Sequence, residues 1–136
     1  MSWLQFVTVV VADYDTAIDF YVRVLGFELV DDSPTLSSSG ALKRWVVVRP
    51  RGAQTALLLA QADGDEQLAA MGHQVGNRVG FFLQVDEFEA TYERIQSFGV
   101  EIESPVRRES YGNVAVFRDI AGNRWDLIET PDAKTA

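Results

Sequence analysis

The sequence predicts an α+β fold built from two βαβββ modules, and two observations carry this prediction. The stretch DYDTAIDFYVRVLGFEL, residues 13–29, is matched at a shift of 73 residues by DEFEATYERIQSFGVEI, residues 86–102. In both copies an apolar run precedes an aspartate placed to cap a helix, and a glycine closes the helical pattern. Two copies are too few for a solenoid, so we expect a closed pair of modules.

The domain prediction follows from where this pattern starts and stops. We expect one domain over 1–136, with the first module at 5–60 and the second at 79–130. The connector, 61–78, carries three glycines and scattered apolar residues, with room for one helical turn at 66–71.

In the first module the β-branched run 6–12 predicts a buried strand, and Asp13 follows as a helix cap. The helix carries an apolar stripe at i, i+3, i+4 and i+7 and ends at Gly26. SPTLSSSG, residues 33–40, is typical of a loop. The remaining strands are expected at 27–31, 44–49 and 55–60.

The second module repeats this order. A strand at 79–85 leads to Asp86, and the helix behind it has Phe88, Thr91, Ile95 and Phe98 as its apolar stripe and ends at Gly99. Three further strands are expected at 100–103, 113–118 and 124–129.

Composition limits the functions that need to be considered. The chain has 20 acidic and 12 basic residues, a net charge of -8, and no basic run, which argues against nucleic acid as a partner. It has no cysteine, hence no disulfide and no thiolate nucleophile. The N-terminal apolar run is too short for a bilayer span and lacks a signal-peptide pattern, so we expect no membrane partner and a cytoplasmic location.

Two motifs together resemble a known superfamily. DYDTAIDFYVRVLGFEL at the first helix and FRDIAGNRWDLIE at the last hairpin are similar to the vicinal oxygen chelate (VOC) superfamily, which includes glyoxalase I, extradiol dioxygenases, and fosfomycin and bleomycin resistance proteins. The resemblance covers nearly the whole chain. It implies a glyoxalase/bleomycin resistance/dihydroxybiphenyl dioxygenase-like fold, a cavity between the modules and a homodimer.

The resemblance also says where metal ligands would stand. Members that use a metal take His, Gln and Glu ligands from four strands, and the matching positions here are Phe6, Leu58, Gly80 and Asp126. Three of these four cannot bind a metal, and shifting the register rescues only the amides of Gln5 or Gln84. We therefore expect no metal and no cofactor, with the single histidine, His73, as a loop residue.

Asp126 is the candidate catalytic residue. On the strand RWDLIE it shares a face with Arg124 and Ile128, the face that the resemblance turns toward the cavity. Two interpretations stay open: Asp126 is a general base with a raised pKa, or it forms a structural ion pair with Arg124.

Further candidates are expected to bind a ligand rather than react with it. Aromatic and apolar side chains would line the cavity, an arginine next to a tryptophan would suit a flat anionic molecule, and the polar loop RRESYGN could reach its mouth. The candidate ligand-binding residues are Phe6, Arg44, Trp45, Leu58, Gln84, Tyr111, Asn113 and Arg124. Core packing of Trp45 and a simple turn at 107–113 are the competing interpretations.

Three functions remain. The first is a metal-independent VOC protein of glyoxalase/bleomycin-resistance type that binds a small, partly apolar or aromatic molecule in the cavity. The alternative is a glyoxalase I-like lyase or isomerase that abstracts a proton beside a carbonyl with Asp126 as base, which would normally need a metal electrophile. A purely structural or interaction domain is the third.

Overall fold

A computed structural model describes residues 1–131 of the chain. The chain divides into two compact units, Met1–Met71 and a second unit that begins at Gly72. Each unit holds one four-stranded sheet with a helix against one face, which confirms the predicted α+β fold of two similar modules. Within residues 1–131, no helix is long and apolar enough to cross a membrane.

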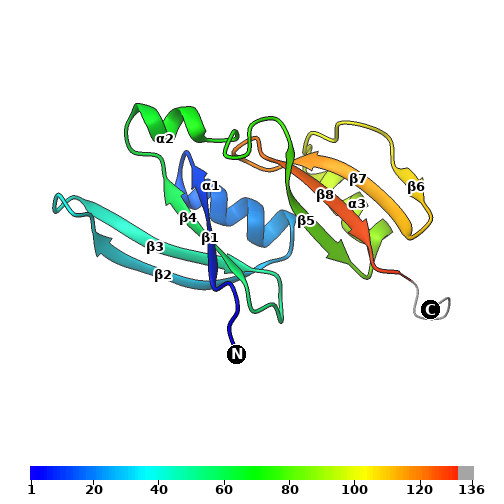
Figure 1. The fold of residues 1–136 in the computed structure, drawn as a ribbon, viewed down its shortest axis with the longest axis horizontal. Helices are drawn as coiled ribbons and strands as arrows, with labels where there is room; N and C mark the ends of the chain where they lie inside the picture. Colours follow the sequence, from blue (N-terminus) through cyan, green and yellow to red (C-terminus); the bar gives the residue numbers. More distant parts are fainter. Residues whose placement is uncertain (132–136) are drawn as a thin grey trace. The chain divides into compact units, whose positions relative to one another are not determined.

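The first sheet has the strand order β1-β4-β3-β2, and β1 and β4 are parallel (Figure 1). Apolar residues at alternate positions on β1, β4 and β3, with Val9, Leu59 and Val46 side by side, pack under the helix. The elements of this unit are β1 (Phe6–Val11), α1 (Tyr14–Asp19), the π-helical turn η1 (Phe20–Val24), β2 (Glu28–Leu36), β3 (Leu42–Arg49), β4 (Ala56–Gln61) and α2 (Asp65–Ala70).

The second sheet repeats the topology as β5-β8-β7-β6, with β5 and β8 parallel. Leu83, Leu127 and Ala115 hold the places that Val9, Leu59 and Val46 hold in the first sheet, and all three are buried. The elements are β5 (Val79–Val85), α3 (Phe88–Ser97), β6 (Arg107–Glu109), β7 (Gly112–Arg118) and β8 (Arg124–Glu129).

The helix boundaries match the sequence signals only in part. The Asp13 side chain accepts a hydrogen bond from the Thr16 amide as an N-cap, and Gly26 and Gly99 both adopt the positive φ expected after a helix. Asp86 does not cap the second helix, because α3 begins at Phe88 behind Glu87.

The buried stripe of the first helix matches the predicted one, Ile18, Tyr21, Val22 and Leu25, only in part. Tyr21 and Leu25 are buried, together with Phe20 and Val24, whereas Ile18 and Val22 are only half-buried. The π-helical turn over Phe20–Val24 adds a residue to the turn and rotates the stripe. On α3, Phe88, Thr91 and Ile95 are buried as predicted, but Phe98 is 44% exposed.

Two strand predictions were wrong. Ser33–Leu36 continue β2 instead of forming a loop, and Pro34 is tolerated because β2 is an edge strand. Residues 100–103 make only the isolated bridge between Ile102 and Phe117, and the fourth strand of the sheet is β6. Pro105, which has no backbone N–H, separates the two segments.

Candidate functional site

Each sheet has a helix-covered face and a second face, which we call the distal face. On the first sheet the distal face is apolar and aromatic. The rings of Phe6 on β1 and Trp45 on β3 meet edge to face, with centroids 5.9 Å apart, from strands on either side of β4. Leu58, on β4, lies on the same face by strand alternation. Trp45 remains 41% exposed, so its ring is available to a ligand and is not core packing.

Arg44 does not share this face, so its predicted partnership with Trp45 was wrong. Its side chain lies on the helix side, where Nη2 donates to Asp15 at 2.9 Å and to Asp32 at 2.8 Å. The guanidinium also lies over the Tyr14 ring, 5.2 Å from its centroid. These bonds raise the pKa of Arg44 and lower that of the Asp32 carboxyl. Arg44 therefore ties the first helix to the sheet edge.

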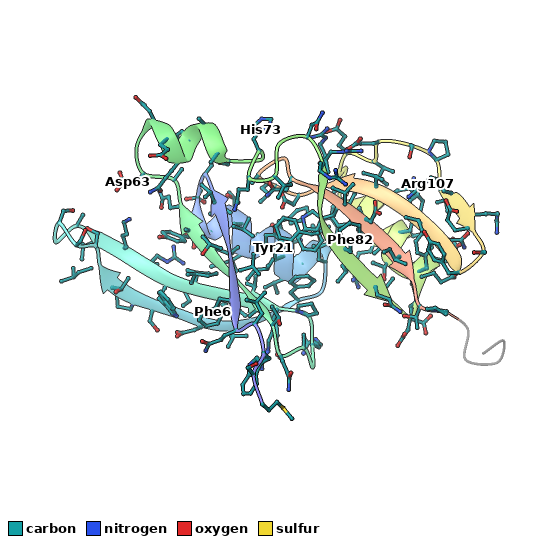
Figure 2. All side chains as sticks on the ribbon, viewed as in Figure 1. Phe6, Tyr21, Asp63, His73, Phe82 and Arg107 are labelled. Carbon is teal, nitrogen blue, oxygen red and sulfur yellow. The ribbon has the colours of Figure 1, made fainter. Side chains whose placement is uncertain are left out.

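The distal face of the second sheet combines an exposed ring with a buried acid. Phe82 on β5 is 65% exposed and stands directly opposite Asp126 on β8, with Gln84 two residues further along the same face. Figure 2 shows Phe82 on β5 and Arg107 on β6, the two edge strands of this sheet.

Asp126 is the most unusual group on this face. Its side chain is only 15% exposed, and its Oδ1 is buried without a hydrogen-bond partner among the described residues. The nearest cation is the Arg107 guanidinium, whose Nη2 lies 4.0 Å from Oδ2. Burial raises the pKa of Asp126, and the charges of Arg107 and Arg124 offset this only in part.

The predicted ion pair between Asp126 and Arg124 is not formed. Arg124 Nε donates instead to Glu103 at 2.7 Å, and its Nη1 donates to the Asn77 carbonyl at 2.8 Å. The bond to Glu103 is the main reason that the pKa of Arg124 is raised. Sequence reasoning missed Glu103 because the pairing depends on residues 100–103 lying beside β7.

The two candidates from the RRESYGN segment, Tyr111 and Asn113, lie in the β6–β7 hairpin and differ in their surroundings. Tyr111 is 49% exposed in the turn. Asn113 pairs with Arg108 and, one residue before Val114, lies on the helix side, away from Asp126. Its backbone N–H donates to Glu129 Oε1 at 3.1 Å. Arg107, on β6, is the residue of this hairpin whose guanidinium lies near Asp126, and no sequence signal separated it from Arg108.

The four positions at which metal-using VOC proteins place ligands hold a poor donor set. Phe6, Leu58 and Gly80 offer no donor atom, and Asp126 offers one carboxylate. A Cβ on Gly80 would lie 2.9 Å from Val75 Cγ2, so a larger side chain there would have to displace Val75. Among residues 1–131, no three His, Cys, Asp or Glu side chains converge in a way that could hold an ion.

Comparison with known proteins gives a consistent picture. A family model described as the Glyoxalase/Bleomycin resistance protein/Dioxygenase superfamily matches residues 3–127. A protein of Shewanella frigidimarina (strain NCIMB 400) is 45% identical over 127 residues, which are 93% of this chain and 92% of that protein.

Solved structures agree with this match over nearly the full length. TnmS3, an antibiotic binding protein from Streptomyces sp. CB03234, is 31% identical with a TM-score of 0.72, covering 96% of this chain and 97% of its own. A glyoxalase/bleomycin resistance protein from the same strain is 30% identical with a TM-score of 0.69, covering 93% of this chain and 99% of its own.

Proposed function

The chain belongs to the glyoxalase/bleomycin resistance protein/dioxygenase superfamily, and from this premise we propose that it binds a small, partly apolar or aromatic molecule without a metal ion. The distal faces of the two sheets are the binding surfaces. The observation that carries the proposal is the set of aromatic rings left accessible on these faces: Phe6 and Trp45 on the first sheet and Phe82 on the second.

The exposure of these rings favours a ligand over a structural role. A phenylalanine that is 65% exposed on a sheet face loses the free energy of burial unless something else covers it. Ligand sites in proteins are mostly apolar walls with a few polar groups that set orientation. Gln84 and Asp126 supply such polar groups near Phe82, and the Arg107 guanidinium lies 4.0 Å from Asp126.

The donor set supports binding without a metal. A transition metal ion needs three or four converging donors, and each missing donor must be replaced by water. At the family's ligand positions only Asp126 has a donor, and Val75 occupies the space beside Gly80. Phe6 and Leu58 are apolar, and an apolar surrounding disfavours the charge of a metal ion.

The similarity to TnmS3 suggests which ligands to try first. That protein is described as antibiotic binding, and 31% identity over nearly the whole of both chains makes aromatic and glycopeptide antibiotics a reasonable first panel. Isothermal titration calorimetry against this panel is the primary test. If no compound in the panel binds, the proposal fails.

Matched variants show whether the rings are the contact. Phe82→Ala and Trp45→Ala should each weaken binding by roughly tenfold or more, because a stacked aromatic contact contributes about 1 kcal/mol or more beyond burial. Phe98→Ala, which removes a 44% exposed ring from the end of α3, is the control and should leave affinity unchanged. Equal loss in all three variants would contradict a distal-face site.

A second candidate function rests on Asp126. A buried carboxyl with a raised pKa suits a general base that abstracts a proton beside a carbonyl, and Arg107 is the one cation near its Oδ2 among the described residues. The test is turnover of methylglyoxal with glutathione, with and without added Ni²⁺ or Zn²⁺. Turnover that disappears in Asp126→Asn would establish the enzyme; no turnover under any condition would leave binding as the function.

A further inference from the structure

The second unit contains a hollow that neither proposed function uses. It has a volume of about 300 Å³ and lies where the connector meets the β7–β8 end of the sheet. This volume is at the lower end of the range for small-molecule pockets. Figure 2 labels His73, which lies in the connector on one side of it. The lining residues are Gly72, His73, Gly76, Asn77, Glu103, Arg118 and Arg124.

Two arginines dominate this hollow. Arg118 and Arg124 are directly opposite each other on β7 and β8, a placement of like charges that is unfavourable unless an anion lies near both. Glu103 Oε2 is that anion, 2.7 Å from Arg124 Nε and 3.4 Å from Arg118 Nε. Among the lining residues two guanidinium groups face this single carboxylate, and the exposed Glu101 lies outside the lining with its Oε2 3.6 Å from Arg118 Nε.

The arginines are held in place and still have donors to offer. Arg118 Nη1 donates to the Gly122 carbonyl at 3.0 Å, and Arg124 Nη1 donates to the Asn77 carbonyl at 2.8 Å. Among residues 1–131, neither Nη2 has a hydrogen-bond partner. Both side chains are about one-third exposed, at 35% and 28%. A small oxyanion could therefore take hydrogen bonds from both guanidinium groups without dismantling the existing ones.

The connector side of the hollow is fixed by close packing. A Cβ on Gly72 would lie 2.5 Å from the Ala121 carbonyl oxygen, so only glycine allows the connector to approach the β7–β8 turn this closely. Gly72 and Gly76 both have positive φ, and the Gly76 amide closes a turn onto the His73 carbonyl at 3.1 Å. These contacts fix the backbone of this part of the connector, and His73 and Asn77 are among the residues that line the hollow.

We propose that this hollow binds the oxyanion group of a small organic acid, a carboxylate or a phosphate ester, between Arg118 and Arg124. The volume of about 300 Å³ suits a compact molecule rather than a polymer. The site lies at the β7–β8 end of the distal face of the second sheet, and its lining contains none of the aromatic rings named above, so it can be tested with ligands that have no ring.

The test uses the intact chain and ions that carry no aromatic ring. Acetate and inorganic phosphate are titrated into ¹⁵N-labelled protein at constant ionic strength, and acetamide, which has the shape of acetate without the charge, is the control ligand. We expect saturable shifts at the amides of Gly72, Gly76 and Asn77 and at the two arginine Nε–H groups with acetate, phosphate or both, and none with acetamide. Saturation by neither anion, or equal shifts with acetamide, would overturn the proposal.

Three variants make the test specific. Arg118→Gln and Arg124→Gln should each weaken anion binding about tenfold, whereas Arg108→Gln, at an exposed position on β6, should leave it unchanged. Glu103→Gln should tighten anion binding several-fold, because it removes the negative charge that competes with the ligand. Glutamine has the same size and keeps an oxygen that can accept from Arg124. Weaker or unchanged binding in Glu103→Gln, with an unaltered circular dichroism spectrum, would contradict the proposed site.

Discussion

The two modules share one topology but differ in what their distal faces carry. Each sheet joins its first and last strands in parallel, β1 with β4 and β5 with β8, and continues through an antiparallel neighbour. The last strand of the first module reads ALLLAQ and offers no charge, whereas that of the second reads RWDLIE and carries Arg124 and Asp126 on its distal face. The first two helix-side positions of each strand are apolar, Leu57 and Leu59 in β4 and Trp125 and Leu127 in β8.

This difference separates the residues that specify the fold from those that specify the ligand. Leu59 and Leu127 occupy matching places at the centre of the two sheets, 1% and 0% exposed. Leu58 and Asp126 occupy distal positions and differ completely in chemistry. Topology requires only the alternation of apolar residues toward the helix, so the other face of each sheet was free to diverge.

The matching cores give the largest expected effect. Leu59→Ala and Leu127→Ala should each lower the free energy of unfolding by about 3 kcal/mol, because each leaves a cavity under a helix. Chemical denaturation followed by circular dichroism measures both. If one substitution costs less than about 1 kcal/mol, the two sheets do not have equivalent cores and the comparison fails.

A smaller effect is expected from a buried carboxylate that is present in the β7–β8 turn of the second module and absent from the matching turn of the first. Asp119, 6% exposed, accepts hydrogen bonds from the backbone N–H of Ala121 and Asn123 and from the side chains of Asn123 and Trp125, at 2.9 to 3.0 Å. Asp119→Ala leaves these buried donors unpaired and should cost about 2 kcal/mol in thermal or chemical unfolding.

The matched control lies in the corresponding turn of the first module. There the Ala53 amide bonds to the Pro50 carbonyl at 3.1 Å, and Arg51 is exposed. Arg51→Ala should change stability by less than about 0.5 kcal/mol. Similar losses from Asp119→Ala and Arg51→Ala would show that the buried carboxylate is not what holds the β7–β8 turn.

The smallest expected effect is the change of stability with pH that is due to Asp126, an acid with no counterpart in the first module. Because burial raises the pKa of Asp126 above 3.8, the folded protein binds this proton more tightly than the unfolded chain. Stability contributed by this group is therefore present at low pH, falls as pH rises from about 4 through the raised pKa, and is constant above it. Asp126→Asn should lack this fall and should be more stable at neutral pH by up to about 1 kcal/mol.

Asp86→Asn, the same substitution at an exposed position that caps nothing, is the matched control. It should leave stability at neutral pH within about 0.5 kcal/mol of the wild type. Loss of stability in Asp126→Asn at neutral pH would mean that the carboxylate has a stabilising partner. The interpretation that burial of Oδ1 without a hydrogen bond destabilises the charged form would then be wrong.

Much of the fold could be predicted because its signals are local. The capping bond of Asp13, the glycines that end both helices and the bounds of β5 and β8 follow from neighbouring residues alone. The errors arose where tertiary context decided. Edge position allowed Pro34 inside a strand, and a π-helical turn rotated the first helix.

The site was harder to predict because it depends on pairing across strands. The resemblance picked out Phe6, Leu58 and Asp126, and strand pairing puts these three on the distal faces, since the face depends only on the parity of each position. The partner of Arg124 could not be found that way, because Glu103 reaches it from a segment that forms no strand.

Metal independence of ligand binding is the central claim, and one titration tests it directly. A compound that binds the purified protein is titrated by calorimetry into protein stripped with EDTA and again after addition of Ni²⁺ or Zn²⁺. Because Phe6, Leu58 and Gly80 provide no donor beside Asp126, the dissociation constant should be the same in both titrations. Binding that is lost after EDTA and restored by one equivalent of metal per chain would contradict the account.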